Sequence, residues 1–200
     1  MDVRAVTNEE YLQFVKSNQA WSKSKVSRIF ADTNYLNHWE SDFIIGKNYE
    51  KIKNSPVTNI SWFAANAYAK WKSKRMPTSA EWEYSANISG NKELTKQVLQ
   101  WYEKPNPEMI PNVKTTDKNK FGLYDMYGLV WEWVHDFNSR VNDTDSRNGT
   151  AVDLGLFCSD GTLKTASKED YASYMRYAFR FSLKGNYCIK NLGFRCASDN

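Results

Sequence analysis

The sequence predicts an α+β fold with little regular secondary structure, in which short helices surround small antiparallel sheets. The chain contains eight Trp, twelve Tyr and ten Phe among 200 residues. This composition indicates a core held by ring packing and by hydrogen bonds from Trp and Tyr side chains. The Thr-x-x-Glu spacing of a capping box occurs twice, before short apolar patterns. Two short segments near the end of the chain resemble strands.

Three short helices are expected in the first half of the chain. The first follows the capping box Thr7-Asn-Glu-Glu10, and the second follows Ser61 as its N-cap. The third follows the capping box of Thr78 and Glu81 and should end near Gly90. The predicted buried stripe of the first helix is formed by Tyr11, Phe14 and Val15, and the inner face of the second by Trp62, Ala65, Tyr68 and Ala69. The third helix carries Trp82 and Tyr84.

The other segments are predicted to be loops, apart from two closing strands. Residues 20–54 form a long packed loop, residues 91–118 a loop with at most a short strand, and residues 137–171 an exposed loop. Residues 175–183 and 191–197 are predicted strands. The first of these strands would carry three polar side chains on one face: Arg176, Arg180 and Ser182.

The length predicts one domain over residues 1–200, since no Pro-, Gly- or Ser-rich linker divides the chain. The net charge of +4 comes from dispersed lysines with acids between them. Because a basic stripe on a recognisable binding fold is missing, nucleic acid is not an expected partner. No apolar run is long enough to span a bilayer, and no signal-peptide pattern opens the chain.

The three cysteines all lie in the last quarter of the chain, at Cys158, Cys188 and Cys196. An odd number leaves at least one thiol unpaired within the monomer, and none of the spacings is that of a zinc clip. One disulfide, most plausibly at Cys158, would suit an extracytoplasmic protein, whereas three buried thiols would suit a cytosolic one.

The most informative stretch is residues 119–136, in which aromatic side chains, two glycines and three acids follow no simple period. This pattern predicts irregular backbone pinned by large side chains. Buried irregular backbone has polar groups that need partners. Asp125 and Glu132 are therefore candidates either to bind backbone groups directly or to hold a cation that prefers oxygen ligands.

Four motifs, taken together, resemble those of the formylglycine-generating enzyme or sulfatase-modifying factor family. They extend over the chain and lie at Arg4–Asn8, at Pro56–Trp62 with Arg75–Tyr84, at Phe121–Trp133 and at Asn191–Cys196. The resemblance implies a C-type-lectin-related α+β fold. It also implies an earlier β-hairpin, so the chain is expected to be truncated at this N-terminal hairpin. Localisation stays open, with a periplasmic or secreted site favoured by the family and by a possible disulfide.

The resemblance also bears on catalysis. The oxidase members use two cysteines ahead of an Arg-x-Ala-x-Arg segment to bind copper and convert a substrate cysteine to formylglycine. Counting back from Asn191, these positions fall at Ser167 and Ala172. Neither side chain supplies the thiolate that Cu(I) prefers. The resemblance therefore implies a member without this oxidase activity and without a redox metal.

A copper or iron oxygenase with a rearranged site is the first alternative. Another branch of the family holds iron with three histidines, whereas this chain has only His38 and His135.

Calcium is a separate expectation. Family members hold a structural Ca²⁺ at positions that correspond to the side chains of Asp125 and Glu132 and the carbonyls of Gly128 and Val130. Direct bonding of the two acids to backbone amides or to Arg195 is the competing interpretation.

The favoured hypothesis is a non-oxidase binding, accessory or maturation domain whose surface groove takes an extended peptide, a protein or a small ligand. The groove candidates are Ser167, Ala172, Arg176, Arg180 and Ser182. For the two arginines, burial against backbone carbonyls or acids is an equally open interpretation. A lectin-like or variable ligand-display domain is the second alternative, although the chain offers only Glu103-Lys-Pro-Asn106 as a sugar motif.

Overall fold

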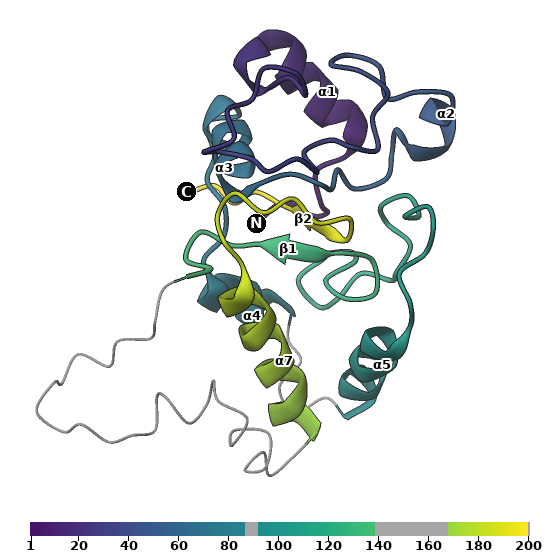
Figure 1. The fold of residues 1–200 in the computed structure, drawn as a ribbon. Helices are drawn as coiled ribbons and strands as arrows, with labels where there is room; N and C mark the ends of the chain where they lie inside the picture. The colour runs from purple at the N-terminus through teal and green to yellow at the C-terminus, as the bar shows by residue number, and fades with distance from the viewer. Residues whose placement is uncertain (87–91, 139–167, 200) are drawn as a thin grey trace, which may run out of the picture.

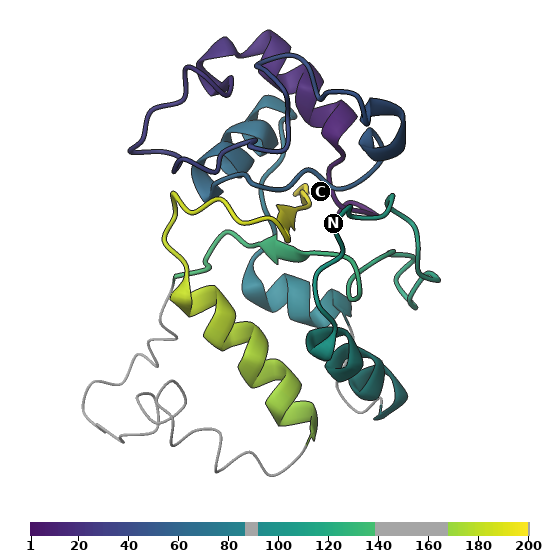
Figure 2. The ribbon, with the colours of Figure 1, turned by 45° about the vertical axis from the view of Figure 1, so that its right-hand side comes forward.

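A computed structural model describes residues 1–86, 92–138 and 168–199. A two-stranded sheet lies between two groups of helices (Figures 1 and 2). Its strands, β1 (Trp131–Trp133) and β2 (Leu192–Phe194), are parallel, with Glu132 opposite Gly193. The helical elements are α1 (Asn8–Ser17), η1 (Gln19–Trp21), α2 (Tyr49–Ile52), α3 (Trp62–Trp71), α4 (Ser79–Ala86), α5 (Lys92–Glu103) and α7 (Lys168–Ser182). The short helices and small sheet make the fold α+β.

The strand direction differs from the expected antiparallel arrangement. A parallel pair needs a crossover between its strands, and here the connection from β1 to β2 contains α7. Among the described residues, antiparallel pairing is confined to three isolated bridges: Thr7–Pro56, Ser41–Ile44 and Arg75–Ala197. Both chain ends lie close to the sheet (Figure 1), where the Val6 amide donates to the carbonyl of Phe194 over 2.9 Å.

The three helices predicted from caps are confirmed. Thr7 and Glu10 form a reciprocal capping box at the start of α1, which satisfies amides that the helix itself cannot pair. The Ser61 side chain accepts the Ala64 amide at the start of α3. The third helix, α4, is described as far as Ala86, and its predicted end at Gly90 lies outside the described residues.

Residues 92–103 form a helix, so the loop predicted over 91–118 is wrong in its first half. The prediction gave weight to the prolines, which come only after this helix. Leu94, Val98 and Tyr102 recur every four residues and therefore share one side of α5. That side meets a small core with Trp82 and Ala172, in which Val98 is fully buried.

The predicted strand at residues 175–183 is also wrong, because residues 175–182 form the second half of α7. Close alternation of polar and apolar side chains suggested a period of two. Arg176 and Arg180 are four residues apart, however, so they also lie on one side of a helix. The first residues of α7 likewise correct the exposed loop expected up to residue 171.

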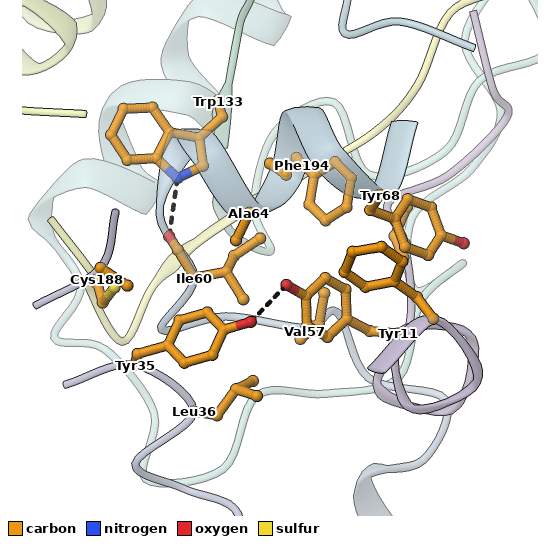
Figure 3. Packing of buried hydrophobic residues seen from close by; sticks show 14 of the residues in the cluster. Tyr11, Tyr35, Leu36, Val57, Ile60, Ala64, Tyr68, Trp133, Cys188 and Phe194 are labelled. Carbon is orange, nitrogen blue, oxygen red and sulfur yellow. Dashed lines mark hydrogen bonds between the residues drawn. The ribbon is translucent and has the colours of Figure 1, made fainter. Parts of the chain in front are cut away.

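The larger core lies between the sheet and helices α1 and α3 (Figure 3). The hydroxyls of Tyr11 and Tyr35 share a hydrogen bond of 2.8 Å at its centre, and Trp133 Nε1 donates to the Ile60 carbonyl over 3.0 Å. The polar tips of these rings are thus satisfied within an apolar environment. Residues 20–54 follow the predicted packed loop, interrupted only by the short η1 and α2.

Candidate functional site

The inner side of α7 carries the arginines that the sequence placed in a groove. Both reach the carboxylate of Glu83 on α4. Arg176 Nη2 lies 2.6 Å from Glu83 Oε2, and Arg180 Nη1 lies 3.0 Å from Glu83 Oε1. The Arg176 side chain is only 1% exposed. Both arginines are therefore buried partners of an acid, which is the second of the two interpretations given above.

Aromatic rings and the α7 backbone complete this cluster. The guanidinium of Arg180 lies 4.9 Å from the ring centre of Trp82, at cation–π distance. Arg176 Nη1 donates to the carbonyl of Ala172 over 3.0 Å, and Ala172 itself is fully buried. Burial opposes the charge of Arg176, but hydrogen bonds and the charge of Glu83 outweigh it and raise the pKa of Arg176. The cluster thus keeps its charges and binds α7 to α4.

The hydroxyl of Tyr127 is buried beside this cluster and has no hydrogen-bond partner among the residues that the structure describes. Its ring lies 5.6 Å from the Arg176 guanidinium and 5.6 Å from the ring of Trp82. Burial raises the pKa of Tyr127, so the phenol stays protonated at neutral pH. Of the remaining groove candidates, Ser182 is exposed and donates to the carbonyl of Phe179, and Ser167 lies outside the described residues.

A shelf of aromatic rings lies next to the arginine cluster. Trp131 of β1 stacks on Tyr102 of α5 at 5.0 Å between ring centres and contacts Phe179 of α7 at 4.4 Å. Trp101 lies 5.4 Å from the same indole. All four rings are half-buried. The sequence offered no signal for this aromatic shelf, because its members come from three segments far apart in the chain.

Asp125 is buried and accepts hydrogen bonds from one short loop. Its carboxylate accepts the backbone amides of Lys114, Thr115 and Thr116, the last two over 2.9 and 3.0 Å. The Thr115 hydroxyl adds a further bond of 3.0 Å. Backbone amides are the partners that one of the two sequence interpretations assigned to this acid.

Glu132 forms a buried ion pair with Arg195. Arg195 Nε lies 2.8 Å from Glu132 Oε2, and the two side chains are 0% and 1% exposed. Trp82 Nε1 donates to the same oxygen over 2.7 Å, while Arg195 Nη2 also donates to the Tyr124 carbonyl. This pair joins the Trp-Glu-Trp and Gly-Phe-Arg-Cys motifs across neighbouring strands.

These partners bear on the predicted calcium site at Asp125, Gly128, Val130 and Glu132. All four carboxylate oxygens already accept hydrogen bonds, and a guanidinium beside Glu132 would repel a cation. In this arrangement the two acids have the direct protein partners of the competing interpretation given above. Calcium binding itself stays a prediction. No group of three or more His, Cys, Asp or Glu side chains within the described ranges is placed to hold a metal ion.

Cys188 and Cys196 are free, buried thiols, and Cys158 lies outside the described residues. Burial raises the pKa of Cys196 to about 12 and that of Cys188 well above its usual value. Because the thiolate is the nucleophile and the metal ligand, neither described cysteine is poised for that chemistry at neutral pH.

The profile of the Sulfatase-modifying factor enzyme 1-like domain matches residues 1–200. The chain belongs to this family. The formylglycine-generating enzyme of Streptomyces coelicolor is 29% identical over 185 residues, which cover 81% of this chain and 58% of that enzyme. The inactive C-alpha-formylglycine-generating enzyme 2 of Bos taurus is 26% identical over 246 residues, which cover 99% of this chain and 76% of that protein.

The serine/threonine-protein kinase pkn1 of Chlamydia pneumoniae is 28% identical over 212 residues, which cover all of this chain. This sulfatase-modifying factor domain spans about a third of that kinase's length, since the match covers 32% of it. No described helix of the domain has the length and apolar character needed to cross a membrane.

His38, one of the two histidines weighed as metal ligands, is bonded to Asn8 and Asn59 in this sulfatase-modifying factor domain. The Asn8 amide nitrogen donates to the carbonyls of Ile52 and Ser55, so its oxygen must be an acceptor. That oxygen lies 3.0 Å from His38 Nε2. His38 Nε2 therefore carries the proton, and Nδ1 accepts from Asn59 over 3.3 Å.

The two ring nitrogens of His38 are thus engaged in a structural hydrogen-bond network. Burial and the positive charge of Lys23 lower the pKa of His38 to about 4, so the imidazole is neutral at physiological pH. His38 lines two cavities of about 270 and 380 Å³. His135 is exposed and lies beside Trp62, with 6.1 Å between ring centres.

Proposed function

We propose that this chain is a non-oxidase member of its family that acts as a binding or accessory domain. The observation that carries the proposal is the inner side of α7. Where the family resemblance places copper-binding thiols, Ala172 is buried, and the adjoining arginines are both paired with Glu83. The inner side of α7 therefore carries a structural cluster of ion pairs in place of a redox centre.

Two further findings support the proposal. The described cysteines are buried with raised pKa values, so they do not replace the missing thiolates. A relative that matches almost the whole chain is named as an inactive formylglycine-generating enzyme. Non-catalytic members of the family are therefore known. The C-type-lectin relationship of the fold is part of the same proposal.

The aromatic shelf is the surface that we assign to an extended peptide or a small ligand. Four half-buried rings meet there on three elements, and such rings supply large contact areas at a small cost in conformational entropy. Asn191 donates its side-chain amide to Asn106 over 3.1 Å. The Asn191 carbonyl accepts the backbone amide of Trp131, so polar groups adjoin the rings.

Catalysis is tested with purified protein incubated with Cu(I) or Fe(II) and then desalted. We expect no stoichiometric metal, no oxygen consumption in the presence of a thiol, and no formylglycine in a cysteine-containing peptide. Stoichiometric copper or iron together with oxygen consumption would refute the proposal and support a rearranged oxidase or oxygenase site.

Binding is tested by selection from a displayed library of random peptides. We expect enriched peptides to bind the parent protein and to lose affinity for Trp131→Ala. The Trp71→Ala variant is the matched control, since Trp71 is 37% exposed on α3 and lies outside the aromatic shelf. Equal binding to both variants would argue against the shelf. Binding to a glycan array instead of peptides would support the lectin-like alternative.

A further inference from the structure

The loop of residues 114–124 presents basic and aromatic side chains on a backbone that is firmly held. Asp125 accepts three successive amides at its start. Asn119 accepts the amides of Phe121 and Leu123 over 2.9 and 3.1 Å and donates to the Ser85 carbonyl on α4 over 2.7 Å. A loop tied at both ends holds its side chains in place before any partner arrives.

Three exposed lysines of this loop lie over aromatic rings. The ammonium groups of Lys114 and Lys118 lie 5.6 and 5.5 Å from the ring centre of Tyr124, and that of Lys120 lies 5.0 Å from the ring of Phe121. None of the three lysines forms an ion pair with a carboxylate of the described residues. Asp117 is the one acid of residues 114–124, so this loop carries three lysines against one carboxylate and is positively charged.

Two exposed rings lie beside these lysines. Tyr84 of α4 is 72% exposed and Phe121 is 41% exposed, with 5.1 Å between their ring centres. Trp82 and Ala86 of the same helix are buried, so burial of the core does not require the Tyr84 side chain. Exposed aromatic side chains that adjoin one another mark interaction surfaces. We call Tyr84, Phe121, Tyr124, Lys114, Lys118 and Lys120 the aromatic–basic face.

We propose that the aromatic–basic face binds an acidic peptide segment of a partner protein. Carboxylates of such a segment would pair with the three lysines, and an apolar side chain of it would pack on Tyr84 and Phe121. Single-stranded nucleic acid fits less well, because it calls for a positively charged groove that follows its backbone, whereas Asp117 interrupts the lysines of this loop. This inference does not depend on the non-oxidase proposal.

The test uses a fluorescein-labelled peptide of Glu and Asp residues with one central Phe, measured by fluorescence anisotropy. The triple variant Lys114→Gln, Lys118→Gln, Lys120→Gln removes the charges of the face. We expect its affinity to be about tenfold lower, because each exposed pair contributes roughly half a kcal/mol. Affinity for the parent protein should also fall as salt rises.

The control is the triple variant Lys16→Gln, Lys51→Gln, Lys70→Gln, which changes the net charge equally at exposed sites elsewhere. It should bind the peptide as the parent does. The Tyr84→Ser variant should weaken binding without changing the salt dependence. The proposal is overturned if the parent does not bind the peptide or if both triple variants bind equally. It is also overturned if a single-stranded oligodeoxynucleotide binds the face more tightly than the peptide.

Discussion

Acid should destabilise this protein through His38 in a pH range where most carboxylates stay ionised. The neutral imidazole donates through Nε2 to Asn8 and accepts at Nδ1 from Asn59. Protonation at Nδ1 would place a donor against the Asn59 amide group, which is itself a donor. It would also place a charge in a partly buried site near Lys23, whose ammonium donates to the Trp39 carbonyl. Burial, and after it the positive charge of Lys23, lower the pKa of His38.

The magnitude follows from the two pKa values. A histidine in the unfolded chain titrates near pH 6.5, whereas His38 in the folded protein titrates at about 4. The unfolded state therefore binds the proton more tightly. The stabilisation is fully present above about pH 6.5 and is lost as pH falls toward 4. Linkage predicts that the free energy of unfolding drops by up to about 2 kcal/mol between pH 8 and pH 5.

The assay is urea unfolding at pH 8, 7, 6 and 5, followed by tryptophan fluorescence. His38→Gln retains an amide donor toward Asn8 but does not titrate, so its stability should change little over the same range. His135→Gln is the matched control, because His135 is exposed, and it should keep the parent's pH dependence. A parent profile as flat as that of His38→Gln would refute the reasoning.

A second measurement does not need the His38→Gln variant to fold. The chain has only two histidines, so NMR of the His135→Gln variant reports on His38 alone. We expect a titration midpoint near pH 4 and nitrogen chemical shifts of a neutral ring protonated at Nε2. A midpoint near 6.5, or a proton on Nδ1, would contradict the assigned network.

Three further predictions concern the strand pair and the carboxylate at its centre. Glu132→Gln should lower the free energy of unfolding by about 3 kcal/mol, because it leaves the buried Arg195 without its charge partner. Glu50→Gln, at a 76% exposed side chain, should change it by less than about 0.5 kcal/mol in the same urea titration. Gly193→Ala should lower the free energy of unfolding by about 1–3 kcal/mol, since a Cβ there would lie 2.9 Å from the Val57 carbonyl. An unchanged urea midpoint would show that the strands adjust freely. If Glu132 acts through its hydrogen bonds, neither millimolar Ca²⁺ nor a chelator should change the melting temperature. A rise in melting temperature with added Ca²⁺ that the Glu132→Gln variant abolishes would establish the calcium site.

Local sequence signals predicted local structure well. The capping boxes at Thr7 and Thr78 and the cap at Ser61 located three helices, because a cap is a contact between residues three positions apart. The strand predicted at residues 191–197 contains β2, whereas the short strand β1 lies in a stretch that was predicted to be irregular backbone. The acids Asp125 and Glu132 were also recognised as anchors of irregular backbone.

The errors arose where distant partners decide the structure. Residues 175–183 alternate well enough to suggest a strand, but Arg176 and Arg180 are held by Glu83, more than ninety positions away. The aromatic shelf likewise depends on Trp131 meeting Phe179 and Tyr102 across three elements. A periodicity of a few residues carries no information about such contacts.

The acids of residues 119–136 show how an irregular segment becomes well defined. Three side chains of the segment bond three different parts of the chain. Asp125 holds residues 114–116, Glu132 holds Arg195, and the Trp133 indole donates to the Ile60 carbonyl. Because every such bond buries a polar group that would be costly to leave unpaired, sliding this segment by one residue would break several of them at once. Side-chain hydrogen bonds thus fix the register here, and they also hold in place the loop that presents the aromatic–basic face.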